Sequence, residues 1–158
     1  MLYALPLVSR CPAGRARVRK ALLSILQTWA GGPVLIHETP RGPEVADHIQ
    51  GQKIFLSLSY AENTAWMALA ANAPIGVDAV SLCECSNWED VASLYFEEKT
   101  MPSLKNAPSP TRAFALAWAK LEARCKHAGL PLREKNPPPE VRTFTQWIGN
   151  SALAVAFI

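Results

Sequence analysis

Two short segments of this chain carry side chains that could do chemistry together. In residues 75–78 a single carboxylate, Asp78, ends a short apolar run. In residues 118–126, Trp118, Glu122 and Lys126 stand four residues apart, so they share one face of a helix. Mg²⁺ in proteins is usually held by one or two carboxylates together with substrate phosphates. If the fold brings Asp78 close to Glu122, the two acids and the lysine form a binding site for Mg²⁺ and a phosphorylated substrate.

Each member of this constellation also has a simpler interpretation. Asp78 could form a turn at the end of a strand, and Glu122 with Lys126 could be a surface ion pair worth ~0.3–0.5 kcal/mol. Trp118 could be an ordinary core residue. Ser59, which lies in an earlier strand, could bond only to backbone. Taken singly these residues favour the simpler interpretations, and only their combination favours a site.

The elements that must position these residues fall into two similar series. We expect the first half to contain, in order, a strand over 2–8, a helix over 12–30, a strand over 34–37, a turn-rich loop over 39–51, and strands over 54–59 and 64–71, and we expect a strand over 75–80 to open the second half. The helix is predicted because its apolar residues repeat at helical period. Gly31 follows its last residue and would end it.

The second half repeats this order of elements. We expect a helix over 88–95 capped by Asn87, a loop over 101–110, a helix over 112–128 capped by Thr111 and ended by Gly129, a mobile proline-rich connector over 133–140, and a hairpin of 141–148 and 152–158 around Gly149 and Asn150. The prediction is an α+β, sandwich-like chain. Its pseudo-twofold halves, residues 1–74 and 75–158, would form one globular unit.

Composition excludes several classes of protein. The 158 residues are 49% hydrophobic and 18% charged, so the chain should fold, and its net charge of +3 is too small to indicate nucleic acid. Four cysteines form no CxxC pair and three histidines show no ligand spacing, which favours free thiols in the cytoplasm over a zinc site. No apolar run approaches the ~20 residues of a membrane span, and the start of the chain does not resemble a signal peptide.

The motifs resemble those of 4′-phosphopantetheinyl transferases of the surfactin-synthetase-activating type. That family has a Gly-Val-Asp strand, here residues 76–78, followed some 40 residues later by a Trp-x-x-Lys-Glu-Ala-x-x-Lys helix, here residues 118–126. Phe114 stands four residues before the Trp, as a Phe often does in the family. The family's Asn-Leu-Ser-His-Ser segment corresponds to residues 57–61, and its Gly-Lys-Pro loosely to residues 41–43.

The resemblance implies a fold, a reaction and partners. The fold is the pseudo-twofold transferase fold with the active site between its halves. Coenzyme A would bind there with Mg²⁺, and its phosphopantetheine arm would move to a serine of an acyl or peptidyl carrier protein. Asp78 and Glu122 would hold the metal, and Glu122 and Lys126 would act in catalysis. Residues expected to bind coenzyme A are Arg15, Arg19, Arg41, Ser59 and Tyr60. The chain is expected to work as a cytoplasmic monomer that binds neither nucleic acid nor membrane, in a polyketide-like, fatty-acid-like or pigment pathway.

Three departures from the family pattern leave alternatives open. Val80 stands where the family often has a second acid, Tyr60 replaces its His, and Leu121 replaces its first Lys. These changes suit a divergent active enzyme, and they also suit a relative that binds carrier protein without catalysis. A small nucleic-acid-binding domain is a third interpretation, suggested by the basic residues between Arg10 and Lys20, but the chain lacks a series of stacking aromatic residues.

Overall fold

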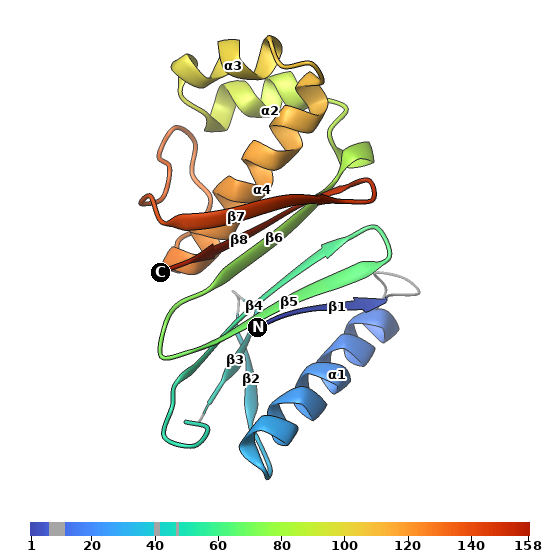
Figure 1. The fold of residues 1–158 in the computed structure, drawn as a ribbon, viewed down its shortest axis with the longest axis vertical. Coiled ribbons are helices and arrows are strands. Elements are labelled where there is room, and N and C mark those ends of the chain that lie inside the picture. Colours follow the sequence, from blue (N-terminus) through green and yellow to red (C-terminus); the bar gives the residue numbers. More distant parts are fainter. Residues whose placement is uncertain (7–11, 40–41, 47) are drawn as a thin grey trace.

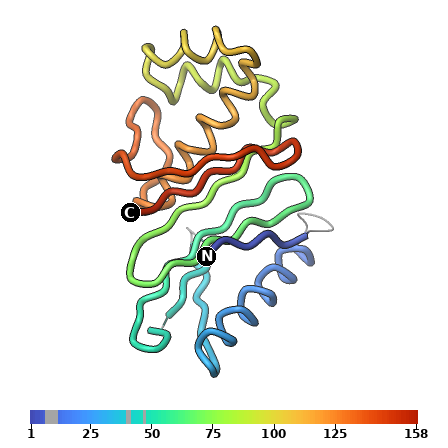
Figure 2. The backbone as a smooth tube through the Cα atoms, in the orientation of Figure 1, coloured from blue at the N-terminus to red at the C-terminus, as the bar shows by residue number. Residues whose placement is uncertain are grey.

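The computed structural model describes residues 1–6, 12–39, 42–46 and 48–158. In these residues four α-helices accompany three small antiparallel sheets, so the chain is a mixed α/β protein of the expected α+β kind (Figure 1). Figure 2 shows that the first part of the chain forms one side of the molecule and the later part the other. The passage between them lies in the turn after residue 71, close to the expected boundary at residue 74.

The first half is a three-stranded sheet covered by one helix. Strands β1 (Leu2–Pro6), β5 (Thr64–Ala71) and β4 (Ile54–Ala61) pair in that order. Helix α1 (Pro12–Ala30) buries Leu22 and Leu26 against Met67 and Leu69 of β5. The predicted helix 12–30 and strand 64–71 are confirmed to the residue. Positions 7 and 8 of the first predicted strand lie outside the described residues.

The loop expected over residues 39–51 was partly wrong. A two-stranded hairpin, β2 (Ile36–Thr39) with β3 (Gly42–Val45), occupies its first part. A loop was predicted in part because Pro43 cannot donate a hydrogen bond to a neighbouring strand. In a two-stranded sheet every strand is an edge, however, and proline is tolerated at an edge.

The second half is also a three-stranded sheet with a long helix. Strands β6 (Gly76–Ser81), β8 (Ser151–Phe157) and β7 (Arg142–Ile148) pair in that order, and helix α4 (Pro110–Ala128) packs across them. Helix α2 (Trp88–Tyr95) and short α3 (Met101–Lys105) lie at the far end (Figure 1). Turns of 3₁₀ helix occupy Leu82–Glu84 and Glu98–Thr100.

Two details of the second half differ from the prediction, and a third agrees with it. Residues 101–110 were expected as a loop, yet α3 forms there because Pro102 stands in its first turn, where a missing N–H is harmless. Helix α4 begins at Pro110 after Ser109, so Thr111 is not its cap. Its expected end is confirmed, because Gly129 adopts a left-handed φ of +64°.

The end of the connector before the final hairpin is held in place by Arg124, whereas the mobility expected of residues 133–140 stays a prediction. The buried guanidinium of Arg124 donates hydrogen bonds to the carbonyls of Pro138 and Pro139 and pairs with Glu140 at 2.8 Å. Prolines supply carbonyl acceptors without competing donors, which suits them to receive an arginine. The hairpin that follows turns at Gly149, as predicted.

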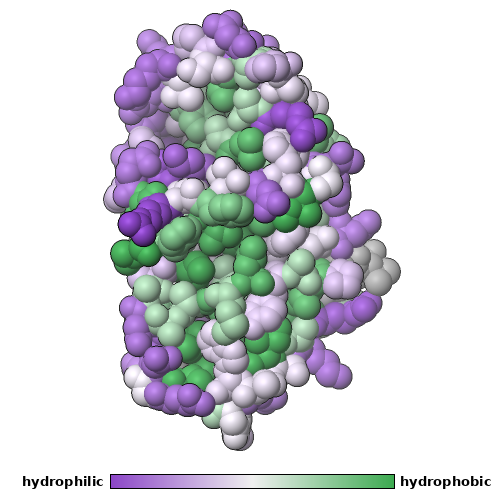
Figure 3. Space-filling model, in the orientation of Figure 1, coloured by the Kyte–Doolittle hydropathy of each residue, from purple (hydrophilic) through white to green (hydrophobic). Residues whose placement is uncertain are grey.

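The two sheets meet along β4 and β6, which we call the seam. Ala61, Trp66 and Ala68 of the first half pack there against Val77, Ala79 and Leu153 of the second. Two hydroxyls stand between the strands: the Val77 N–H donates to Ser57 Oγ at 2.9 Å and the Ala79 N–H to Ser59 Oγ at 3.0 Å. Figure 3 shows apolar side chains gathered across the middle of one face, at the level where the halves meet.

Among the residues that the structure describes, no helix is long and apolar enough to cross a membrane.

Candidate functional site

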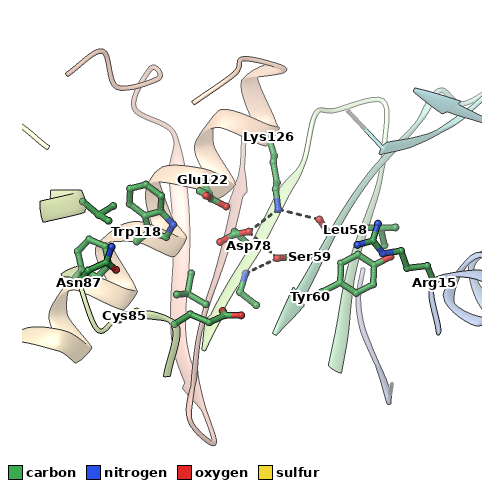
Figure 4. A pocket seen from close by; sticks show the side chains of 15 residues that line it. Arg15, Leu58, Ser59, Tyr60, Asp78, Cys85, Asn87, Trp118, Glu122 and Lys126 are labelled. Atoms are coloured by element: carbon green, nitrogen blue, oxygen red, sulfur yellow. Dashed lines mark hydrogen bonds and ion pairs between the residues drawn. The ribbon is translucent and has the colours of Figure 1, made fainter. Parts of the chain in front are cut away.

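A glycine allows β6 to pass unusually close to α4. A Cβ on Gly76 would lie 1.9 Å from the carbonyl oxygen of Ala123 and 2.6 Å from the amide nitrogen of His127. Both are backbone atoms, so no side chain could move aside to make room. This close approach places Asp78, two residues along the strand, beside the face of α4 that carries Glu122 and Lys126 (Figure 4).

Asp78 is buried, and its two carboxylate oxygens differ in their surroundings. The side chain is 3% exposed. Its Oδ1 accepts hydrogen bonds from Ser59 Oγ at 2.8 Å and from Lys126 Nζ at 2.7 Å (Figure 4). Its Oδ2 is buried and has no hydrogen-bond partner among the described residues. An unpaired buried carboxylate oxygen is costly, so this atom is a candidate ligand for a cation.

Lys126 bridges the two halves. Its ammonium donates to the carbonyls of Leu58 in β4 and Val77 in β6, both at 3.1 Å, and to Asp78 Oδ1. These three bonds use all three donors of the ammonium. The lysine therefore supplies the positive charge beside Asp78 and links β4 to β6 at the same time.

Glu122 lies between Trp118 and Lys126 and faces Asp78 (Figure 4). Burial, followed by the negative charge of Asp78 and by the hydrogen bond that a protonated Glu122 can give to Asp78, raises the pKa of Glu122 to about 7. The charge of Lys126 and a hydrogen bond with Trp118 act in the opposite direction. A carboxyl with this pKa exchanges its proton near neutral pH, which is the property of a general acid or base. A cation bound between the two carboxylates would favour the ionised form.

These residues line a cavity of about 470 Å³ at the seam. Its polar wall includes Arg15, Ser59, Tyr60, Asp78, Glu84, Glu122 and Lys126. Its apolar wall includes Val80, Val91, Phe114 and Trp118. Trp118 stacks on Phe114 with ring centroids 5.7 Å apart. The tryptophan is therefore both a packing residue and part of the cavity wall.

A second cavity of about 760 Å³ lies next to the first. Both are lined by Leu58, Tyr60 and Lys126, so these residues stand between the two cavities. Arg19, Lys53 and His127 supply the basic groups of the second cavity, and its apolar wall includes Pro43, Phe55 and Leu130. The Nε and Nη2 of Arg19 donate to the carboxylate of Glu38.

The structure brings most of the predicted site residues together. Asp78, Glu122, Lys126, Ser59, Tyr60 and Arg15 line the first cavity, whereas Arg19 lines the second. Arg41 lies outside the described residues. The roles predicted for these residues stay predictions.

Sequence reasoning missed one residue of the cavity wall and one residue of the seam. Glu84 comes from the 3₁₀ turn after β6 and lines the cavity, and Ser57 makes the same kind of bond across the seam as Ser59. The alternation of Ser57 and Ser59 was a usable signal, since residues two apart on a strand share a face. Glu84 gave no comparable signal, because its position depends on the turn.

The two carboxylates fit a magnesium ion. Among the described residues no group of three or more His, Cys, Asp and Glu side chains could hold a metal by itself. Mg²⁺ does not require such a group, because it retains waters and takes substrate phosphates as ligands. The open Oδ2 of Asp78, facing Glu122, supplies the protein's share of such a site.

In comparisons with known proteins, neither a protein-family model nor a curated protein matches this chain.

Proposed function

We propose that this protein is a 4′-phosphopantetheinyl transferase, which moves the phosphopantetheine arm of coenzyme A to a carrier-protein serine and releases 3′,5′-ADP. The observation that carries the proposal is the meeting of Asp78, Glu122 and Lys126 in one cavity at the seam, with Asp78 Oδ2 open toward Glu122. The resemblance of the sequence motifs gives the reaction class. The transferase fold and a cytoplasmic location belong to the same proposal.

Asp78 and Glu122 would hold Mg²⁺, which when bound neutralises charge on the diphosphate of coenzyme A. The remaining work falls to the chain's own residues. Lys126 lies beside both carboxylates, and its positive charge lowers the energy of negative charge that builds up on the leaving phosphate. Arg15 adds a second positive group to the same cavity.

Glu122 is the candidate general base. As the serine oxygen attacks phosphorus, the O–P bond forms, the bond from phosphorus to the oxygen of 3′,5′-ADP breaks, and the serine proton passes to Glu122, directly or through a water. The pKa of about 7 belongs to the metal-free site, and a bound cation would lower it, so in the loaded site Glu122 would be ionised and able to accept the proton. Such assistance is worth roughly 10²–10⁴-fold in rate.

The two neighbouring cavities would suit a long substrate with an anionic middle, if the substrate passes between them beside Lys126. The diphosphate would lie between the cavities near Lys126, and the nucleotide end would enter the larger cavity, where Arg19 and Lys53 could meet its phosphate. The arm would run along the apolar wall of the first cavity toward Trp118. Both halves contribute walls, so one chain would suffice and we expect a monomer.

The proposal is tested by incubating the protein with coenzyme A, Mg²⁺ and a panel of apo acyl and peptidyl carrier proteins. Mass spectrometry should show at least one carrier gaining one phosphopantetheine, with 3′,5′-ADP in equal amount. Omitting Mg²⁺ should stop the reaction. No modification of any carrier, together with no binding of coenzyme A by the folded protein, would contradict the proposal.

A second candidate is a relative that binds carrier proteins without modifying them. The observation that favours it is the saturation of the Lys126 ammonium by three acceptors, which leaves no N–H for a phosphate unless the side chain moves. A stable complex with an apo carrier, formed without coenzyme A and without mass gain when it is added, would support this candidate.

A further inference from the structure

Two serines of β4 make matching bonds across the seam. The hydroxyl oxygens of Ser57 and Ser59 accept hydrogen bonds from the amides of Val77 and Ala79, at 2.9 and 3.0 Å. Both serines are buried. Their hydroxyls replace part of the backbone ladder that two neighbouring strands would otherwise share, so each serine contributes similarly to holding the halves together.

The two serines differ in what the hydroxyl does next. Ser59 donates its proton to Asp78 Oδ1 at 2.8 Å, so a chain of bonds runs from the Ala79 amide through Ser59 to the carboxylate. Lys126 donates to the same oxygen at 2.7 Å. Two donors therefore hold Oδ1, while Oδ2 is buried and has no hydrogen-bond partner among the described residues.

We propose that Ser59 is a positioning residue, which with Lys126 holds Asp78 so that the carboxylate binds the metal through Oδ2 alone. This inference rests on the proposed function, because it assumes that the metal lies between Asp78 and Glu122. Ser59 thus acts through Asp78, in addition to any contact that it makes with coenzyme A. Partners that orient a ligating carboxylate typically change metal affinity 10–100-fold when they are removed.

The donor and the ligand come from different halves of the chain. Ser59 lies on β4, whereas Asp78 lies on β6 and the second donor, Lys126, lies on α4 in the same half as Asp78. A carboxylate without these two donors would lose its fixed orientation and would offer both oxygens to water or metal. The orientation of the ligand therefore depends on one donor from across the seam, Ser59, and on one from its own half, Lys126.

The test measures direct binding of Mn²⁺ to the substrate-free protein, and the electron paramagnetic resonance signal of the free ion reports how much has bound. Ser57→Ala is the matched control, because it removes an equivalent bond across the seam without touching Asp78. We expect Ser59→Ala to raise the Mn²⁺ dissociation constant ~10–100-fold and Ser57→Ala to change it less than about threefold. Ser59→Thr retains a hydroxyl and should retain most of the wild-type affinity.

Activity gives a second readout that a merely structural role would not move. In Ser59→Ala the Mg²⁺ concentration for half-maximal rate should rise by a similar factor, and saturating Mg²⁺ should restore a large part of kcat. If Ser59→Ala does not fold, Ser59→Cys takes its place, since a thiol has similar size and is a poor donor.

The outcomes distinguish failure of the positioning role of Ser59 from failure of the proposed transferase function. Equal Mn²⁺ affinity in Ser59→Ala and Ser57→Ala, with wild-type protein binding well, would overturn the positioning role and leave the transferase proposal intact. Failure of wild-type protein to bind Mn²⁺ with or without coenzyme A would overturn the metal site itself.

Discussion

Helices α1 and α4 have the same length and lie on equivalent sheets, yet they pack in different ways. Each contains 19 residues. Helix α1 buries the large side chains of Leu22 and Leu26, which keep its backbone away from the strands. Helix α4 buries Ala115, Ala119 and Ala123, and Gly76 beneath it has no side chain.

This difference explains why the acids of the site belong to the second half. A helix that touches a strand through its backbone can bring short side chains such as Asp78 within reach of its own residues. A helix held off by leucines cannot do so. Helix α1 instead extends long basic side chains, Arg15 and Arg19, which reach the cavities from a distance. Small residues in α4 therefore serve the site as much as the core.

The largest expected effect is the loss of the paired carboxylates. Asp78→Ala and Glu122→Ala should each lower the rate of carrier modification at least ~10³-fold, because both metal ligation and proton transfer depend on them. The rate is measured at saturating Mg²⁺, and circular dichroism checks the fold. Near wild-type turnover in either variant would show that the metal assignment is wrong.

A substitution at Gly76 tests whether the site depends on the close contact between β6 and α4. Gly76→Ala must push β6 away from α4 and should cost about 1–3 kcal/mol of unfolding free energy, or more. It should also lower activity steeply, since Asp78 moves relative to Glu122. Leu22→Ala in the first half is the counterpart: it should cost about 2–5 kcal/mol in urea unfolding but leave kcat within about threefold under native conditions.

If the two variants lost activity in equal proportion to stability, the site would not depend on the close β6–α4 contact.

The raised pKa of Glu122 predicts a dependence of stability on pH. Below its unfolded pKa of 4.5 the group is protonated in both states and contributes no difference. As pH rises toward about 7 the unfolded chain releases the proton first, so the metal-free protein should lose about 2–3 kcal/mol relative to Glu122→Gln. Urea unfolding of both proteins with chelator, between pH 4.5 and 8, measures this difference. A constant difference across that range would contradict the raised pKa.

The smallest expected effect concerns the basic face of α1. Coenzyme A should raise the melting temperature, Mg²⁺ should enlarge the rise, and dephospho-coenzyme A should give a smaller one. Arg19→Ala should reduce the advantage of coenzyme A over the dephospho form, by roughly tenfold in affinity. Arg17→Ala, which changes an exposed residue of the same helix that lines neither cavity, is the matched control. Equal stabilisation by both compounds in wild-type protein would remove the argument for a 3′-phosphate site.

Local patterns were enough to predict most of the elements. Helix 12–30 has a periodic apolar face. Helix α4 ends at Gly129, which adopts the left-handed conformation that favours glycine at the end of a helix. The errors came from prolines, which were taken as loop signals. Pro43 lies in an edge strand and Pro102 in the first turn of α3, and both positions tolerate a missing N–H.

The residues of the site could be predicted from the sequence, but the hydrogen bonds between them could not. The spacing of Glu122 and Lys126 already placed them on one helix face. No sequence pattern indicated that Lys126 would donate to the Leu58 carbonyl, or that only one oxygen of Asp78 would be held. Those contacts join residues 19 to 68 positions apart, and only the packing of the two sheets determines them.

The seam also covers one edge strand of each three-stranded sheet. Strand β4 ends the order of the first sheet and β6 ends that of the second, and each covers the other. An uncovered edge strand is a template for pairing with another chain. A fragment ending at residue 74 would expose β4 together with the apolar surface of Ala61 and Trp66, so we expect it to pair with a second copy of itself. In the intact chain the second half covers the β4 edge, so that this strand cannot pair with another molecule.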